Sequence, residues 1–89
     1  MSSKVRRLTL LERGYCHLCE RMREALAPLL AGSDVVLDRV DVDADRALEA
    51  RWGTLVPVLL DGERELCHFR LDASAVRAWL SEPARGFAP

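Results

Sequence analysis

The stretch Gly14-Tyr15-Cys16-His17-Leu18-Cys19 lies between a predicted strand and a predicted helix. Before it, residues 5–11 are rich in leucine and β-branched residues and stop just before Glu12, which indicates a strand. After it, from His17 to about Ala31, apolar residues recur every three or four positions, as they do on one face of an amphipathic helix. The two cysteines are therefore predicted to lie where a strand gives way to a helix.

Two cysteines separated by two residues at the start of a helix are close enough to form a small disulfide ring. Unpaired amide N–H groups and the positive end of the helix dipole stabilise a thiolate at this position. Cys16, at or just before the first turn, is predicted to be the attacking thiolate. Cys19, one turn further on, is predicted to be the resolving thiol. The pattern indicates redox chemistry, with metal binding or an incidental pair as the alternatives.

The middle of the chain predicts a second strand and a short helix. Residues 35–42 open with an apolar run and then alternate between apolar and charged side chains, as a strand does. Asp43 is expected to cap a helix over about residues 44–52, and Gly53 is expected to end it in a left-handed conformation.

The last third of the chain predicts a hairpin followed by a helix. Residues 58–60 and the residues from Glu63 onward are expected to pair across a two-residue Asp61-Gly62 turn. Counting back from that turn places Val56 opposite Cys67.

A final helix is expected over about residues 73–81, with Asp72 as its cap. Leu71 and Val76 are spaced to form a hydrophobic staple.

The predicted fold class is α/β, with the element order β-α-β-α-β-β-α. The first two strands are joined through a helix and should be parallel with a right-handed crossover, whereas the last two form an antiparallel hairpin. We therefore expect a four-stranded mixed sheet flanked by helices. The length of 89 residues fits a single domain over 1–89, with a core over about 5–81 and a tail over 82–89.

Composition excludes several classes of function. The formal net charge is −1 and the two signs are interspersed, so we expect no nucleic-acid partner. No apolar run approaches the roughly 18–20 residues that span a bilayer, and no signal-peptide pattern is present, so we expect no membrane partner. Three cysteines, an odd number, fit no disulfide framework, and a reducing compartment would keep them as thiols. We therefore expect a cytoplasmic location.

Three motifs together resemble the glutaredoxin family. They are Cys16-His17-Leu18-Cys19 at the strand–helix junction, Val56-Pro57-Val58 before the hairpin, and Asp41-Val42-Asp43 at the end of the second strand. More closely, they resemble a bacterial glutaredoxin-like branch with a CHLC motif, and the match covers about residues 5–80. It implies a thioredoxin-like (glutaredoxin-type) fold with the strand order 2-1-3-4.

The resemblance also implies roles for individual residues. Cys16 would be the nucleophile and Cys19 the resolving cysteine. Pro57 would follow a cis peptide bond and face the disulfide, and the backbone of Val56 would pair with the cysteine of a bound substrate, as an added strand does. The implied activity is that of a thiol–disulfide oxidoreductase.

Other positions are implied to contact the substrate. Arg13 matches a basic residue that helps to hold the glutathione carboxylate, and Tyr15 would flank the thiolate. His17 is a candidate proton shuttle or thiolate-stabilising cation, with an exposed polar residue as the alternative. We expect no bound cofactor and no metal, with glutathione as a candidate reductant. The expected partner is a disulfide-bearing protein or glutathione, and the expected state is a monomer.

The sequence departs from the glutaredoxin pattern in two places. His17 and Leu18 replace the usual proline and tyrosine between the cysteines. The stretch over residues 68–72 keeps an aspartate but lacks the Gly-Gly pair that receives the γ-glutamyl end of glutathione.

A non-catalytic binding module of the same fold is the alternative function. Cys16, Cys19, Cys67 and His68 together could form a Cys₃His zinc site, although adjacent strand residues such as Cys67 and His68 point to opposite faces. An iron–sulfur cluster shared between two chains, or a protein-interaction role, is a further form of this alternative. Taken alone, Cys67 is interpreted as a small buried hydrophobe, with a third redox thiol as the alternative.

Two other groups of residues have structural interpretations. Asp41, Asp43 and Asp45 are explained by a strand end followed by a helix cap. Trp52 and Trp79 are expected to pack in the core or at its rim.

Overall fold

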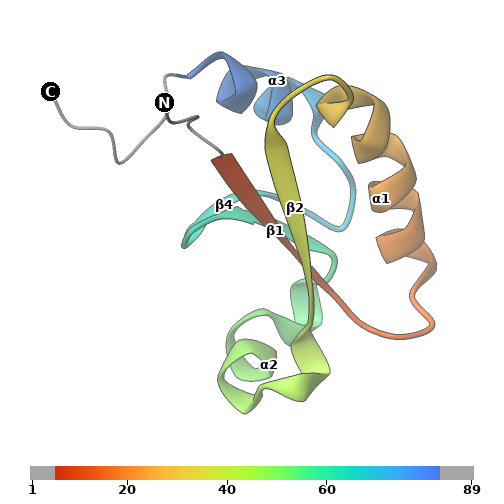
Figure 1. Cartoon of the computed structure of the whole chain (residues 1–89). Helices are drawn as coiled ribbons and strands as arrows, with labels where there is room; N and C mark the ends of the chain where they lie inside the picture. The colour runs from red at the N-terminus through yellow and green to blue at the C-terminus, as the bar shows by residue number, and fades with distance from the viewer. Residues whose placement is uncertain (1–5, 83–89) are drawn as a thin grey trace, which may run out of the picture.

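The strands and helices follow one another in the predicted β-α-β-α-β-β-α order (Figure 1). The structure, a computed structural model, describes residues 6–82, so the expected strand start at residue 5 and the expected tail from residue 83 lie outside the described part. The elements are β1 (Arg6–Glu12), α1 (His17–Leu30), β2 (Val35–Asp41), α2 (Arg46–Trp52), β3 (Val58–Asp61), β4 (Arg64–His68) and α3 (Ala73–Ser81). Two short 3₁₀ turns, η1 (Val42–Ala44) and η2 (Gly53–Leu55), flank α2.

The four strands form one mixed sheet in the order β2-β1-β3-β4. β1 and β2 are parallel because α1 carries the chain back to the starting edge between them. β3 runs antiparallel to both β1 and β4. This confirms the expected mixed sheet and strand order. The pairing of Leu11 with Val58 brings the end of β1 beside the start of β3.

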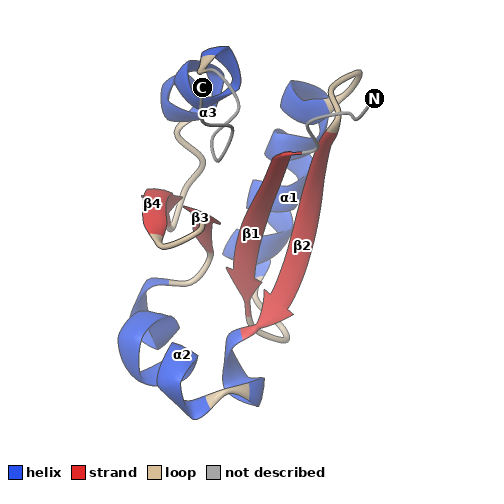
Figure 2. Cartoon of the chain, turned by 60° about the vertical axis from the view of Figure 1, so that its left-hand side comes forward, coloured by secondary structure: helices blue, strands red, loops and turns tan. Residues whose placement is uncertain are grey.

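Two apolar clusters lie on opposite faces of the sheet. On one face, Leu8 and Leu10 of β1 pack with residues of α1 and α3, including Met22 and Trp79. Both helices lie on this side in Figures 1 and 2. On the other face, Leu11 and other residues of the sheet pack with Val42 of η1 and Trp52 of α2. Because side chains alternate along a strand, β1 contributes to both clusters and holds the two layers together.

Both tryptophans pack as expected, since Trp79 is 1% exposed and Trp52 is 9% exposed. None of the helices over residues 6–82 is long and apolar enough to cross a membrane.

α2 begins two residues later than predicted because Asp45, and not Asp43, is its cap. The Asp45 side chain accepts hydrogen bonds from the backbone N–H groups of Ala47 and Leu48, at 2.8 and 3.1 Å. The expectation for Asp43 is therefore wrong, because its carboxylate is instead bound to a side chain of the β1–α1 loop. The expected left-handed Gly53 is also wrong. Its φ is −56°, since the chain continues from α2 directly into η2.

The β3–β4 hairpin turns one residue later than predicted. Asp61 pairs with Arg64, so Gly62 and Glu63 are the turn residues, and Gly62 supplies the positive φ of 63° that such a turn needs at its first position. A register shift between Leu59 and Leu60 then places Cys67 opposite Leu59. The predicted pairing of Cys67 with Val56 is therefore wrong.

The ends of α1 and α3 follow from local side-chain chemistry. Asp72 caps α3 as predicted, because its carboxylate accepts a hydrogen bond from the N–H of Ala75 at 3.0 Å. Leu71 and Val76 belong to the same apolar cluster. Pro28 lies within the last turn of α1, and the helix ends two residues later at Leu30.

Candidate functional site

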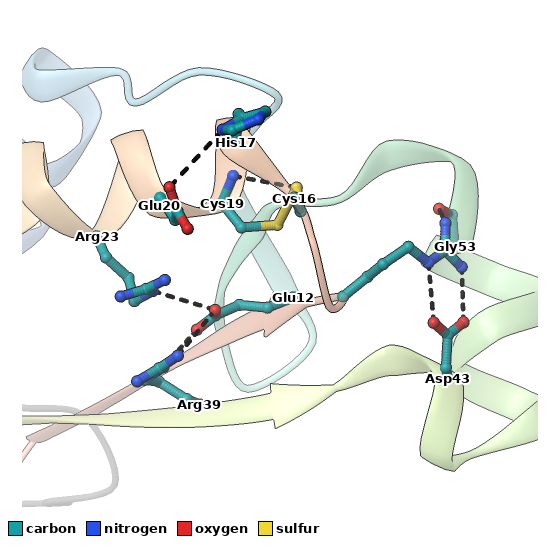
Figure 3. Close-up of a disulfide and its surroundings, with 10 residues drawn as sticks. Glu12, Cys16, His17, Cys19, Glu20, Arg23, Arg39, Asp43 and Gly53 are labelled. Atoms are coloured by element: carbon teal, nitrogen blue, oxygen red, sulfur yellow. Dashed lines mark hydrogen bonds and ion pairs between the residues drawn. A yellow bond between two sulfur atoms is a disulfide. The ribbon is translucent and has the colours of Figure 1, made fainter.

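Cys16 and Cys19 lie at the amino terminus of α1 and are joined by a disulfide, with their Cα atoms 5.2 Å apart (Figure 3). Cys16 is the N-cap residue and has extended backbone angles. Its Sγ accepts a hydrogen bond from the backbone N–H of Cys19 at 3.1 Å. The sulfur thus takes the place that a serine or aspartate oxygen occupies at an ordinary helix start, where amide hydrogens favour a negative charge.

The two cysteines differ in their access to solvent. Cys19 is 1% exposed and belongs to the buried set, whereas Cys16 is only partly buried. An incoming disulfide can therefore reach the Cys16 sulfur and not the Cys19 sulfur. This asymmetry is the one that an attacking and a resolving cysteine require.

The residues beside Cys16 are open to solvent. Tyr15 is fully exposed and has a positive φ of 57°, a left-handed conformation that is uncommon for a residue with a side chain. The side chain of His17 is 94% exposed, and its Nδ1 lies 3.8 Å from Oε1 of Glu20. Both residues project from the loop and the first turn that carry the disulfide, so they lie on its rim.

The Val56–Pro57 peptide bond is cis, and Pro57 is buried. Because Val58 pairs with Leu11, this dipeptide lies at the end of the sheet from which the β1–α1 loop departs. The Pro57 carbonyl accepts a hydrogen bond from the N–H of Phe69 at 2.9 Å. The loop after β4 is thereby joined to the segment that contains Pro57.

Arg13 is bound to the segment around α2. Its Nε and Nη2 donate to the two Asp43 carboxylate oxygens at 3.0 and 2.8 Å, and its Nη1 donates to the Gly53 carbonyl at 3.0 Å (Figure 3). Glu49 lies 3.6 Å from the same guanidinium. The hydrogen bonds from Arg13 to Asp43 hold the pKa of the Asp43 carboxyl below its ordinary value. Three of the five Arg13 donors are therefore already used within the chain.

Comparison with known proteins identifies the family. Residues 7–81 match the model of the glutaredoxin-like domain (DUF836). The chain belongs to this family.

Solved structures agree with the family match. The X-ray structure of protein XcR50 from X. campestris is 46% identical, with a TM-score of 0.68, over 85% of this chain and 99% of that one. The solution NMR structure of protein Ne2328 from Nitrosomonas europaea is 34% identical, with a TM-score of 0.77, over 91% of this chain and 98% of that one.

A mutant thioredoxin from Halobacterium salinarum shares the fold at 23% identity, with a TM-score of 0.55 over 93% of this chain and 77% of that one. The glutaredoxin-like domain therefore has the thioredoxin-like fold that the sequence predicted.

Cys67 of the glutaredoxin-like domain takes no part in the disulfide. It is a free cysteine of β4, 8% exposed, and burial raises the pKa of its thiol. The neighbouring His68 is paired with Glu65. Over residues 6–82 no group of three or more His, Cys, Asp or Glu residues is placed to hold a metal ion, so the Cys₃His alternative is not assembled there.

The structure also shows a buried acid, Glu12, bound by two arginines, which sequence reasoning missed. Glu12 is 8% exposed at the end of β1. It accepts hydrogen bonds from Nε of Arg23 on α1 at 3.1 Å and from Nε of Arg39 on β2 at 2.6 Å (Figure 3). The acid thus connects three elements directly beneath the loop that carries Cys16. Glutamate next to the buried run at Leu10 and Leu11 was the sequence feature that could have indicated it.

Phe69 is a second residue that the sequence did not single out. It has a positive φ of 66° and is 42% exposed, and it stands in the stretch where the family pattern has glycines. Leu18, between the two cysteines, is 40% exposed. Two apolar side chains are therefore presented to solvent at the rim of the site.

Proposed function

We propose that this glutaredoxin-like domain is a thiol–disulfide oxidoreductase that acts through Cys16 and Cys19. One observation carries the proposal: a disulfide at the amino terminus of α1 combines a partly exposed, N–H-bonded sulfur with a buried one. A structural disulfide needs no such difference between its two sulfurs. An exchange reaction does, because one sulfur must be accessible to the substrate while the other lies within bonding distance of the first.

In the proposed reaction the reduced protein transfers two electrons to a substrate disulfide. The Cys16 thiolate attacks one substrate sulfur, forms a mixed disulfide and releases the other substrate sulfur as a thiolate. The Cys19 thiol then loses its proton and attacks Cys16 Sγ, which breaks the mixed disulfide and releases the second substrate thiolate. The Cys16–Cys19 disulfide is re-formed, and an external thiol or reductase returns the two electrons.

The remaining site residues are assigned to the rim of this reaction. Tyr15 and His17 are exposed beside Cys16, and the Val56 backbone next to Pro57 is assigned to pairing with the substrate chain. Arg13 is assigned to substrate carboxylates only through the donors that Asp43 and Gly53 leave free, so its main contribution is to position the β1–α1 loop.

The proposal also names the substrate class, the oligomeric state and the cellular compartment. The partner is a disulfide-bearing protein or glutathione, and no resident cofactor or metal takes part. The protein acts as a monomer in the cytoplasm, where a reducing thiol pool can regenerate the dithiol.

The decisive experiment combines thiol counting with turnover. The oxidised protein should show two fewer alkylatable thiols under denaturing conditions than the same protein treated with dithiothreitol. Reduction of a small neutral disulfide such as hydroxyethyl disulfide should require Cys16, and Cys16→Ser should abolish it. Cys19→Ser should instead accumulate a mixed disulfide, visible as a mass increase. Glutathione and a thioredoxin reductase system are compared as electron donors.

Cys67→Ala is the matched control, since it removes a cysteine outside the proposed reaction. It should retain turnover of hydroxyethyl disulfide with the preferred donor. Turnover that survives Cys16→Ser, or a reduced protein that reacts with no disulfide, would refute the proposed function.

A further inference from the structure

An open groove of about 580 Å³ begins beside the disulfide and runs between α1 and the loop that joins β4 to α3. We call it the α1 groove. Figure 1 shows that loop running alongside α1. The residues used below are Leu18, Arg21 and Ala25 on α1, with Phe69, Arg70 and Leu71 on the loop.

The α1 groove is connected to both parts of the proposed redox site. Leu18 lies between the two cysteines, so one wall of the groove starts within the motif itself. Phe69 is hydrogen-bonded through its N–H to the Pro57 carbonyl at 2.9 Å, so the other wall is attached to the cis-proline segment. A chain whose cysteine has reached Cys16 therefore meets this groove with the residues next to that cysteine.

The mouth of the α1 groove is apolar. Leu18 and Phe69 are 40% and 42% exposed, and with Tyr15 they are the exposed large hydrophobic side chains of residues 6–82. Exposed apolar side chains gathered beside a reactive group mark a surface that is covered when a partner binds.

The groove is also positively charged. Arg21 and Arg70 are both exposed, and neither guanidinium has a hydrogen-bond or ion-pair partner within residues 6–82. No acidic residue lines the groove. The nearby Asp72 carboxylate is bound to the Ala75 N–H as the α3 cap. Two unpaired cations beside an apolar patch complement a ligand that carries an apolar side chain and carboxylates.

We propose that the α1 groove docks the segment flanking the target cysteine of a protein substrate, and that this segment combines a bulky apolar side chain with acidic residues. The apolar side chain packs between Leu18 and Phe69, and the acidic side chains pair with Arg21 and Arg70. This inference rests on the proposed function, because the docked segment is the one whose disulfide Cys16 attacks. It narrows the substrate from any disulfide to acidic, apolar protein segments.

The test uses short synthetic peptides whose single cysteine is joined by a disulfide to nitrothiobenzoate. One peptide carries leucine and two glutamates beside the cysteine. The second replaces the glutamates with lysines, and the third replaces the leucine with alanine. The reduced protein attacks the peptide sulfur and releases the coloured nitrothiobenzoate thiolate, so rapid mixing gives a rate constant for each peptide.

The glutamate peptide should react about fivefold faster than the lysine peptide at low salt, with the difference shrinking at high salt. The alanine peptide should react about three- to fivefold more slowly than its leucine counterpart. The double variant Arg21→Glu with Arg70→Glu should reverse the charge preference. Because the preference is a ratio measured within one variant, a general change in thiol reactivity cancels.

Two further variants make the result specific to the groove. Arg77→Glu makes one arginine-to-glutamate change on α3, outside the groove, and should leave the glutamate-to-lysine ratio unchanged, whereas Arg21→Glu alone should lower it. Ala25→Phe fills the groove from an exposed helix position and should remove the advantage of leucine over alanine. Circular dichroism of each variant checks that the fold is retained.

The outcomes separate this inference from the proposed function. Equal rates for the glutamate and lysine peptides, with Cys16-dependent reduction of hydroxyethyl disulfide intact, would refute docking of an acidic segment in the α1 groove. The proposed oxidoreductase function would not be affected. If oxidised glutathione is reduced as fast as the glutamate peptide and with the same dependence on Arg21 and Arg70, the α1 groove binds glutathione. That result would refute a protein segment as its occupant. Concentration-dependent self-association lost in the double variant would assign it to a second copy of the chain. Reaction with no disulfide would overturn both proposals.

Discussion

At the scale of single residues, the three cysteines occupy three different environments. Cys16 is partly exposed and its sulfur accepts an N–H at a helix start, Cys19 is 1% exposed one turn later, and Cys67 is 8% exposed in β4. Burial raises the pKa of the Cys67 thiol, which keeps it protonated as the pH rises through the range where an exposed thiol ionises. Cysteine reactivity follows thiolate content and access, so the three should react in a fixed order.

We predict that in the reduced, folded protein iodoacetamide labels Cys16 at least about tenfold faster than Cys19 at mildly acidic pH, because only the Cys16 sulfur is both accessible and stabilised as an anion. Cys67 should stay unlabelled until the protein is unfolded. Peptide mass spectrometry after timed quenching measures all three. Comparable labelling of Cys16 and Cys67 in the native state would contradict the assignment of Cys16 as the nucleophile.

Glu12 is the other residue whose environment predicts a measurable effect. Its carboxylate is nearly buried and is bound by Arg23 and Arg39, so Glu12→Gln removes the charge and leaves both cations without their partner. We expect the free energy of unfolding in urea to fall by about 1–2 kcal/mol. Asp38→Asn is the control, because Asp38 makes a 3.7 Å exposed pair with Arg7, and it should change stability by less than about 0.5 kcal/mol. Equal effects would show that burial of Glu12 has no energetic consequence.

At the scale of elements, periodicity and turn chemistry fixed which segments are helices and strands but not where each one starts. The apolar spacing of α1 and the Asp72 cap of α3 were predicted correctly, because they depend on residues close together in the chain. Asp43 and Asp45 are equivalent as sequence signals. Only the folded chain, which brings Arg13 to Asp43 from 30 residues away, decides that Asp45 is left to cap α2.

The hairpin register and the α1 groove could not be predicted from neighbouring residues for a similar reason. The later turn moves Cys67 from Val56 to a position opposite Val58, and the register shift between Leu59 and Leu60 then places it opposite Leu59. Nothing in the alternation of β3 and β4 marks either change. The disulfide pair was predictable because its spacing and its helix start are both local. The convergence of Leu18 with Phe69 and Arg70 depends on how α1 packs against a loop some 50 residues later, so the sequence offered no sign of it.

The capping of α2 gives a prediction at this scale. Asp45→Ala removes the acceptor for the N–H groups of Ala47 and Leu48 and should lower the free energy of unfolding by about 1 kcal/mol. Asp45→Ser supplies another side-chain oxygen at the cap and should recover most of that loss. Urea denaturation of both variants measures the effect. A loss of the same size in the serine variant would mean that the aspartate charge, and not the cap, stabilises α2.

At the scale of the whole molecule, neither of the two apolar clusters contains Cys16 or Cys19. The two apolar clusters on opposite faces of the sheet are built around leucine, valine and tryptophan from nearly every element, and the disulfide closes a ring between residues only three apart. A ring this short restricts the unfolded chain little, so the disulfide should contribute about 2 kcal/mol to stability. Stabilisation of the Cys16 thiolate by the helix start offsets part of this when the bond is reduced.

We therefore predict that reduction leaves the fold intact. Adding dithiothreitol should lower the free energy of unfolding by no more than about 2 kcal/mol and leave the far-ultraviolet circular dichroism unchanged, so that both redox forms present the same rim to a substrate. The Cys16→Ser protein, which has no disulfide to reduce, should show no response to dithiothreitol and serves as the control. A loss of helical signal on reduction of the native protein would show that the bond holds α1 in place, which is the behaviour of a structural disulfide and not of one that opens and closes in each catalytic cycle.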